Sequence, residues 1–178
     1  GLWNIGGDGQ FLLAAAVVAG LGPAVMGGLP RGPGLVVLGV VGLVVGGLWT
    51  VLPAYLRAWH GVNEVVTTLM MSFIAINLAN LLIRGLWRST ETTVPQTYAV
   101  PLDELLPRFG GTTIHVGIVL GLAAVVIGWY ILDRTATGLR LTVLGANRRA
   151  ALHAGFQVKR LVLGAFFASG ALIGLGGA

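Results

Sequence analysis

The sequence contains no cysteine and very little charge. Only six acidic and eleven basic residues occur among 178, so 10% of the chain is charged, against about a quarter in soluble domains. Without cysteine there is no disulfide, thiolate nucleophile or cysteine-ligated metal. Hydrophobic residues make up 56% of the chain and the mean hydropathy is +0.89. These values exclude a soluble domain and intrinsic disorder, and they predict a membrane protein.

Five stretches without Asp, Glu, Lys or Arg are long enough, or nearly so, to cross a bilayer, which takes about 20 residues. We expect an all-α, polytopic transmembrane helical bundle that forms one domain over residues 1–178. Residues 1–10 are either an internal N-terminal tail or a half-helix that dips into the bilayer. The predicted spans are Phe11–Gly28, Gly34–Leu56, Val65–Ile83, Ile114–Leu132 and Leu161–Ala178.

The excess positive charge lies in one loop. From Asp133 to Arg160 there are six basic residues and one acid, whereas the rest of the chain has five of each. Lys and Arg are retained in cytoplasmic loops, so we predict that this loop is cytoplasmic and that the balanced loop Arg84–Thr113 is external. Tyr55–Glu64 is then internal. The confinement of charge to one loop also argues against a nucleic-acid partner, despite a pI of 10.8.

Glycine is abundant, with 29 residues, and three pairs within the predicted spans have GxxxG spacing. Small residues let helix backbones approach closely in a bilayer, so we interpret the pairs as helix-packing sites. They are Gly42 with Gly46, Gly117 with Gly121, and Gly170 with Gly174.

Polar residues of the third span recur at helical spacing and form one stripe. The amides of Asn77 and Asn80 are costly against lipid, so they should face protein or water. They either bridge helices or line a path for a polar, uncharged solute. We therefore take Asn63, Thr67, Asn77 and Asn80 as candidate substrate-path residues, on a stripe that also holds Met70, Phe73 and Arg84.

The basic loop contains a short predicted helix. Asn147 suits its N-cap, Arg148–Ala154 its two turns, and Gly155 the left-handed residue that ends it. Arg148 and Arg149 lie in the first turn, where the helix dipole disfavours cations. The two arginines serve either topological retention or contact with an acidic cytoplasmic partner.

Enzyme chemistry finds little support in the sequence. His60, His115 and His153 are scattered, and no span contains an acid that could serve a proton relay. The glycine-rich stretch Gly6–Gly9 follows no strand, which argues against a nucleotide fingerprint. We predict no catalytic residue, no metal site and no cofactor. Any ATP that drives transport would be hydrolysed by another chain.

Three segments together resemble nucleoside-type ABC transporter permeases, a group related to simple-sugar and branched-chain amino acid permeases. Asn4–Gln10 resembles the pattern Asn-Ile-Gly-x-Glu-Gly-Gln, with Asp8 in place of the glutamate. Gly61–Met70 is similar to Gly-x-Asn-Glu-Val-Ile-x-Thr-Leu-Met. Thr137–Asn147 resembles the cytoplasmic loop that precedes a Ser-Gly-Ala-Leu-x-Gly-Leu-x-Gly-Ala helix, here Ser169–Ala178.

The resemblance implies a permease subunit of an ATP-driven importer in the bacterial inner membrane. Its partners would be ABC ATPase subunits, a second permease subunit and an external substrate-binding lipoprotein. Family permeases carry further helices on both sides, so we expect a domain that is incomplete at both ends. By position, the signature polar residues near the path would be Asn4, Asp8, Gln10, Asn63 and Glu64. The ATPase coupling helix would comprise Asn147–Gly155, including Arg148, Arg149 and Ala151.

Two alternatives stay open. The solute is a nucleoside by resemblance alone, and simple sugars or branched-chain amino acids fit the same polar stripe. A non-transporting membrane scaffold subunit fits the composition equally well.

Overall fold

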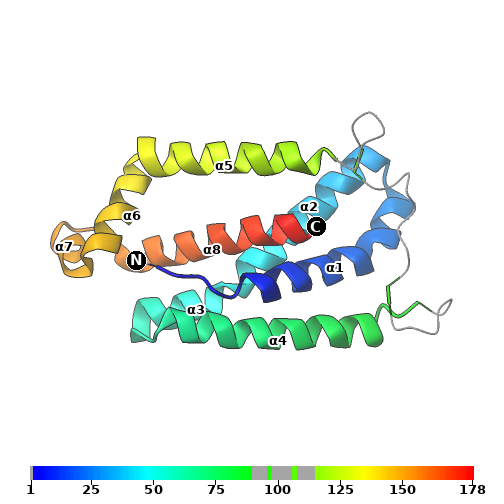
Figure 1. Cartoon of the computed structure of the whole chain (residues 1–178), viewed down its shortest axis with the longest axis horizontal. Coiled ribbons are helices and arrows are strands. Elements are labelled where there is room, and N and C mark those ends of the chain that lie inside the picture. The colour runs from blue at the N-terminus through cyan, green and yellow to red at the C-terminus, as the bar shows by residue number, and fades with distance from the viewer. Residues whose placement is uncertain (1, 90–95, 98–105, 108–114) are drawn as a thin grey trace.

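The structure is a computed structural model that describes residues 2–89, 96–97, 106–107 and 115–178. These residues form helices and no strand, which confirms the all-α prediction (Figure 1). In chain order the elements are α1 (Gly7–Gly28), α2 (Arg31–Trp49), α3 (Val51–Tyr55), the π-helical turn η1 (Leu56–His60), α4 (Glu64–Arg84), α5 (Gly117–Arg134), α6 (Ala136–Ala146), α7 (Arg148–His153) and α8 (Val158–Gly177).

Five helices of the described chain are long and apolar enough to cross a membrane, as the sequence predicts. The largest difference lies in the second span. It continues as one 30-residue helical stretch, Arg31–His60, so most of the predicted internal loop Tyr55–Glu64 is helical. The π-helical turn leads into Gly61, whose φ of +67° ends the helix in the left-handed conformation that glycine tolerates. Most of the predicted external loop Arg84–Thr113 lies outside the described residues.

Four of the long helices pack together, and the fifth does not. The helix α8 lies against α1 and α2, although it comes last in the described sequence, and α1 also packs on α4 (Figure 1). The helix α5 has no buried residue, and its main neighbour in the described part of the chain is α6. The core therefore comprises α1, α2, α4 and α8.

Glycines bring α2 and α8 into backbone contact. A Cβ atom on Gly46 would collide with the carbonyl oxygen of Gly170, and one on Gly174 would collide with that of Gly42. Two of the three predicted glycine pairs thus pack against each other. Gly121, of the third pair, has no atom of the described chain within 4 Å of where its Cβ would lie.

Candidate functional site

The N-terminal segment enters the bundle before it becomes helical. Leu2–Gly6 forms no helix, and the Ile5 amide donates to the Thr68 hydroxyl of α4 over 3.2 Å. The Gly9 amide donates to the Ser72 hydroxyl over 3.0 Å. At 1.5 Å per residue, Ser72 lies about 12 Å beyond the start of α4. The first helix therefore begins about two turns deeper than α4, with an extended segment beside it.

A pair of amide side chains, Asn4 and Gln10, anchors this extended segment. Asn4 and Gln10 exchange two side-chain hydrogen bonds of 3.1 Å, and the Asn4 amide also donates to the Ser169 hydroxyl of α8 over 3.1 Å. Gln10 is 1% exposed. Every buried side-chain nitrogen or oxygen of the described residues has a partner, as an apolar interior requires. The pair thus ties the N-terminal segment to α1 and α8.

The two predicted acids of the signature set lie apart from this pair. Asp8 is exposed on the first turn of α1. Glu64 is 5% exposed at the start of α4, where its carboxylate lies 3.2 Å from Arg57 Nε of η1. The ion pair therefore connects the π-helical turn to α4.

The helix α4 has two polar faces, of which the sequence reading found one. The buried face carries Glu64, Thr68 and Ser72, followed by two alanines, and packs on α1. Thr68, Ser72 and Ser169 were missed because single hydroxyls are common in apolar helices. A usable signal was present, since Glu64, Thr68 and Ser72 recur every four residues.

The predicted solute-path stripe lies on the opposite, largely exposed face of α4. The side-chain amides of Asn77 and Asn80 donate to the carbonyls of Phe73 (2.8 Å) and Ile76 (3.0 Å), one turn back. Asn63 caps the helix by accepting from the Val65 amide, and the Thr67 hydroxyl bonds to backbone carbonyls of the same turn. The amide nitrogens of Asn77 and Asn80 are thus satisfied within α4, and both side chains remain accessible from outside the described bundle.

The short helix α7 has the ends that the sequence predicts. The Asn147 side chain accepts from the amides of Arg149 (2.9 Å) and Ala150 (3.2 Å), and Gly155 has φ +76°. Ala151 is fully buried in a hydrophobic cluster that includes Leu144 of α6 and Val158 of α8. Arg148 donates from Nη2 to the carbonyl of Ala58 over 3.2 Å. These contacts fix α7 to the bundle.

The outer side of α7 makes no such contact with another described element. Arg149 and Leu152 are exposed, Leu152 by 55%. Among the predicted coupling residues, Asn147, Arg148, Ala151 and Gly155 therefore shape and hold the helix, while Arg149 is presented outward. Leu152 was not predicted, and it adds an apolar contact to the presented surface.

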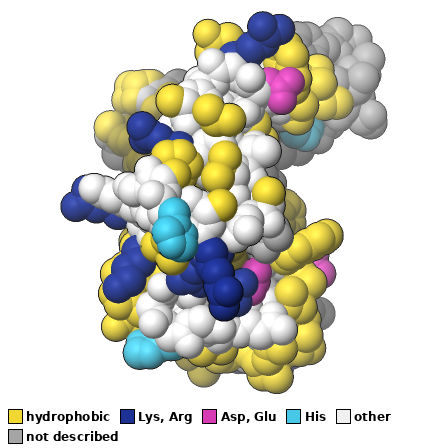
Figure 2. All heavy atoms as spheres, turned by 90° about the vertical axis from the view of Figure 1, so that its left-hand side faces the viewer, with side chains coloured by type: hydrophobic (Ala, Val, Ile, Leu, Met, Phe, Trp, Pro, Cys, Tyr) yellow, Lys and Arg dark blue, Asp and Glu magenta, His cyan; other side chains and the backbone are white. Residues whose placement is uncertain are grey.

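Basic side chains gather around α7 on one end of the molecule. Figure 2 shows this end, where Lys and Arg outnumber acids. Lys159 lies 4.9 Å from the centre of the Trp59 ring, and Arg140 lies 6.0 Å from that of Phe156, both cation–π contacts. The geometry suits a protein or lipid surface that carries negative charge.

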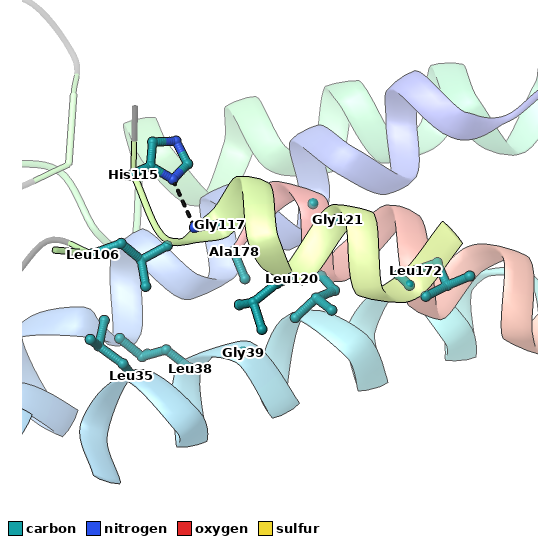
Figure 3. Close-up of a pocket in the computed structure, with 13 residues that line it drawn as sticks. Leu35, Leu38, Gly39, Leu106, His115, Gly117, Leu120, Gly121, Leu172 and Ala178 are labelled. Carbon is teal, nitrogen blue, oxygen red and sulfur yellow. Dashed lines mark hydrogen bonds between the residues drawn. The ribbon is translucent and has the colours of Figure 1, made fainter. Parts of the chain in front are cut away.

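A cavity of about 370 Å³ lies between α2, α5 and α8 (Figure 3). Leucines of all three helices line it, including Leu38, Leu120 and Leu172. His115 also lines the cavity, and its Nδ1 accepts from the Gly117 amide over 3.2 Å. The walls offer little to a polar solute, and the described residues contain no group of side chains that could hold a metal ion.

Comparison with known proteins gives relatives over nearly the whole chain. It is 34% identical to a glucose ABC transporter permease of Haloferax volcanii, with 99% of this chain and 49% of the relative aligned. A guanosine ABC transporter permease of Bacillus subtilis is 31% identical over 100% of this chain and 51% of the relative. A nucleoside ABC transporter permease of Lactococcus lactis subsp. cremoris is 28% identical over 99% of this chain and 51% of the relative.

The chain therefore spans about half the length of these relatives. No solved structure matches it. The family model described as branched-chain amino acid transport system / permease component matches residues 1–178, the full length of the sequence. Together with five apolar helices, this match shows a multi-pass membrane protein that belongs to that permease family.

Proposed function

We propose that the chain forms the transmembrane part of an ATP-driven ABC importer that moves a polar, uncharged solute across the bacterial inner membrane. The observation that carries this proposal is α7, a short capped helix held rigidly on the basic end of a permease-family bundle. One side of α7 is held to the bundle by Ala151 and Arg148, and the other side exposes Arg149 and Leu152. A helix placed in this way is suited to transmit movement from a docked ATPase. The other partners would be a second permease subunit and an external substrate-binding lipoprotein.

A nucleoside is the favoured solute. Two of the three relatives are described as nucleoside or guanosine permeases and the third as a glucose permease. All three solutes are polar and uncharged, which agrees with a path lined by amides. Simple sugars are the second candidate, because the glucose permease is 34% identical to this chain, against 31% and 28% for the guanosine and nucleoside permeases.

The assembled transporter provides the direct test. We expect guanosine, delivered by the cognate binding lipoprotein, to stimulate ATP hydrolysis and to accumulate in proteoliposomes only when ATP is present. Glucose and leucine are the matched comparisons. Stimulation by glucose alone would replace the nucleoside assignment, and an assembly that binds no ATPase would overturn the importer proposal.

The orientation can be tested with cysteine probes, because the chain has no native cysteine. Leu86 is 72% exposed beyond the end of α4, and Leu152 is 55% exposed on α7 at the basic end. We expect Leu86→Cys to react with an impermeant maleimide from outside intact cells, and Leu152→Cys to react only after permeabilisation. The reverse pattern would place α7 outside and remove the ATPase from its surroundings.

The exposed face of α4 supplies the candidate solute path. Asn77→Leu with Asn80→Leu removes two exposed amides whose side-chain nitrogens bond within α4, so the bundle should keep its stability. In the full-length assembly we expect uptake to fall about two- to tenfold for each net hydrogen bond to the solute that is lost, since such a bond contributes about 0.5–1.5 kcal/mol. Ser72→Ala, on the buried face, is the contrasting variant, and it should lower stability instead. Normal uptake by the double variant would remove Asn77 and Asn80 from the path.

A further inference from the structure

A second pocket opens on the basic end, where α6 meets the start of α8. Its volume is about 410 Å³, and its lining includes Arg140 of α6, Gln157 before α8, and Arg160 on the first turn of α8. The only ion pair among the described residues joins Arg57 to Glu64, so no described carboxylate neutralises Arg140 or Arg160. Two arginines that line one pocket without a carboxylate partner among the described residues favour an anionic ligand.

The same pocket has apolar walls. Phe156 and Leu161 line it, and the Arg140 guanidinium lies 6.0 Å from the centre of the Phe156 ring. Arg160 is the last charged residue before the apolar run of α8, which places the pocket at the boundary between the polar end and the membrane-spanning part. Leu139, next to Arg140 on α6, is 64% exposed. The anion that fits these surroundings carries an apolar part beside its charge.

We propose that Arg140 and Arg160 bind the phosphate of an acidic phospholipid, with the lipid's acyl chains against the apolar surface of α8. Basic pockets between membrane helices on the cytoplasmic side bind such headgroups. Arginine suits the task because its planar fork can donate two hydrogen bonds to one phosphate. A free phosphate ion would use the arginines alone and would gain nothing from the apolar walls. The bound lipid would brace α6 against α8, next to α7.

Lipid binding to the full-length protein tests the proposal without ATP or solute, so it stands or falls independently of the importer function. The probe is phosphatidylglycerol, titrated by native mass spectrometry, with phosphatidylcholine for comparison. A basic residue near an anionic surface contributes about fivefold to binding. We therefore expect Arg140→Gln with Arg160→Gln to weaken the tightest phosphatidylglycerol site about 25-fold and to leave phosphatidylcholine unchanged.

Two further variants separate charge from folding. Arg134→Gln removes one positive charge from the same loop outside the pocket, and it should change binding less than twofold, against about fivefold for either pocket arginine alone. Arg140→Lys with Arg160→Lys keeps the charge and the topology signal, and it should bind within about fivefold of the parent. Unchanged phosphatidylglycerol affinity in the double glutamine variant would overturn the proposal.

Competition experiments identify the source of the phosphate. We expect inorganic phosphate at about 10 mM to leave the lipid in place. This concentration is about tenfold above a Kd of about 1 mM for the free ion. Displacement by that ion would make the pocket a soluble-anion site and would refute the lipid assignment. Loss of ATPase association with unchanged lipid binding in the double glutamine variant would refute it as well, because the pocket would then be a protein contact.

Discussion

Replacing Gly46 with valine is expected to separate α2 from α8 and to destabilise the bundle strongly. The added side chain would meet the carbonyl oxygen of Gly170 and the backbone of Gly174, and neither can rotate away. Extra methylene groups in a well-packed core cost about 1–3 kcal/mol, and a clash with backbone that cannot rotate away should cost about 3 kcal/mol or more. We expect little monodisperse protein in detergent and a lowered thermal midpoint for what remains.

The matched control is Gly164→Val in α8. Its Cβ position has nothing within 4 Å, so valine is accommodated without displacement. Both variants make the same chemical change in a membrane helix, and they differ only in the contact. We expect the control to match the parent within about 1 kcal/mol. Equal stability of the two variants would show that α2 and α8 do not touch as described.

Reversing the outward surface of α7 is expected to stop transport while the protein stays folded. Arg149→Glu with Leu152→Asp alters two exposed side chains of α7 and leaves the cap, the buried Ala151 and the Arg148 contact intact. If the ATPase docks there, the loss of a central interface contact costs about 2–4 kcal/mol. Solute-stimulated ATP hydrolysis should fall at least about 30-fold, with normal membrane insertion and thermal stability.

A charge reversal in this loop also weakens the topology signal, which the control must share. Arg134→Glu makes the same arginine-to-glutamate reversal as Arg149→Glu in the same loop but outside α7, and it should leave stimulated hydrolysis near the parent rate. Impermeant labelling at Leu86→Cys would verify insertion in each variant. Full activity of the α7 double variant in a correctly inserted protein would refute the coupling role.

Much of the fold could be predicted from two features of the sequence, the uncharged runs and the helix-capping residues. Uncharged runs gave the five spans because a bilayer admits few polar groups, and Asn147 and Gly155 marked the ends of α7 because their types suit helix caps. The second span was read too short. Arg57 was taken as its limit, whereas it continues the helix and pairs with Glu64.

Which face of α4 meets α1 could not be read in advance. Two stripes of polar residues run along this helix, and period alone predicts both. Contact with α1 selected the face with small side chains, because Ser72 and the alanines permit close approach and the hydroxyls bond to backbone amides of the N-terminal segment. The larger amides were left outside. Sequence spacing carried no information about this choice, since it depends on contacts with residues 63 positions away in the sequence.

The glycine contact between α2 and α8 has a consequence for how the protein is made. More than a hundred residues separate Gly46 from Gly170, so α2 enters the membrane long before α8 leaves the ribosome. Pairing between such distant segments is slow, because a long loop must close first. Until α8 is inserted, the glycine face of α2 at Gly42 and Gly46 therefore lacks its partner helix. A chain released before α8 would remain an unassembled target for membrane proteases.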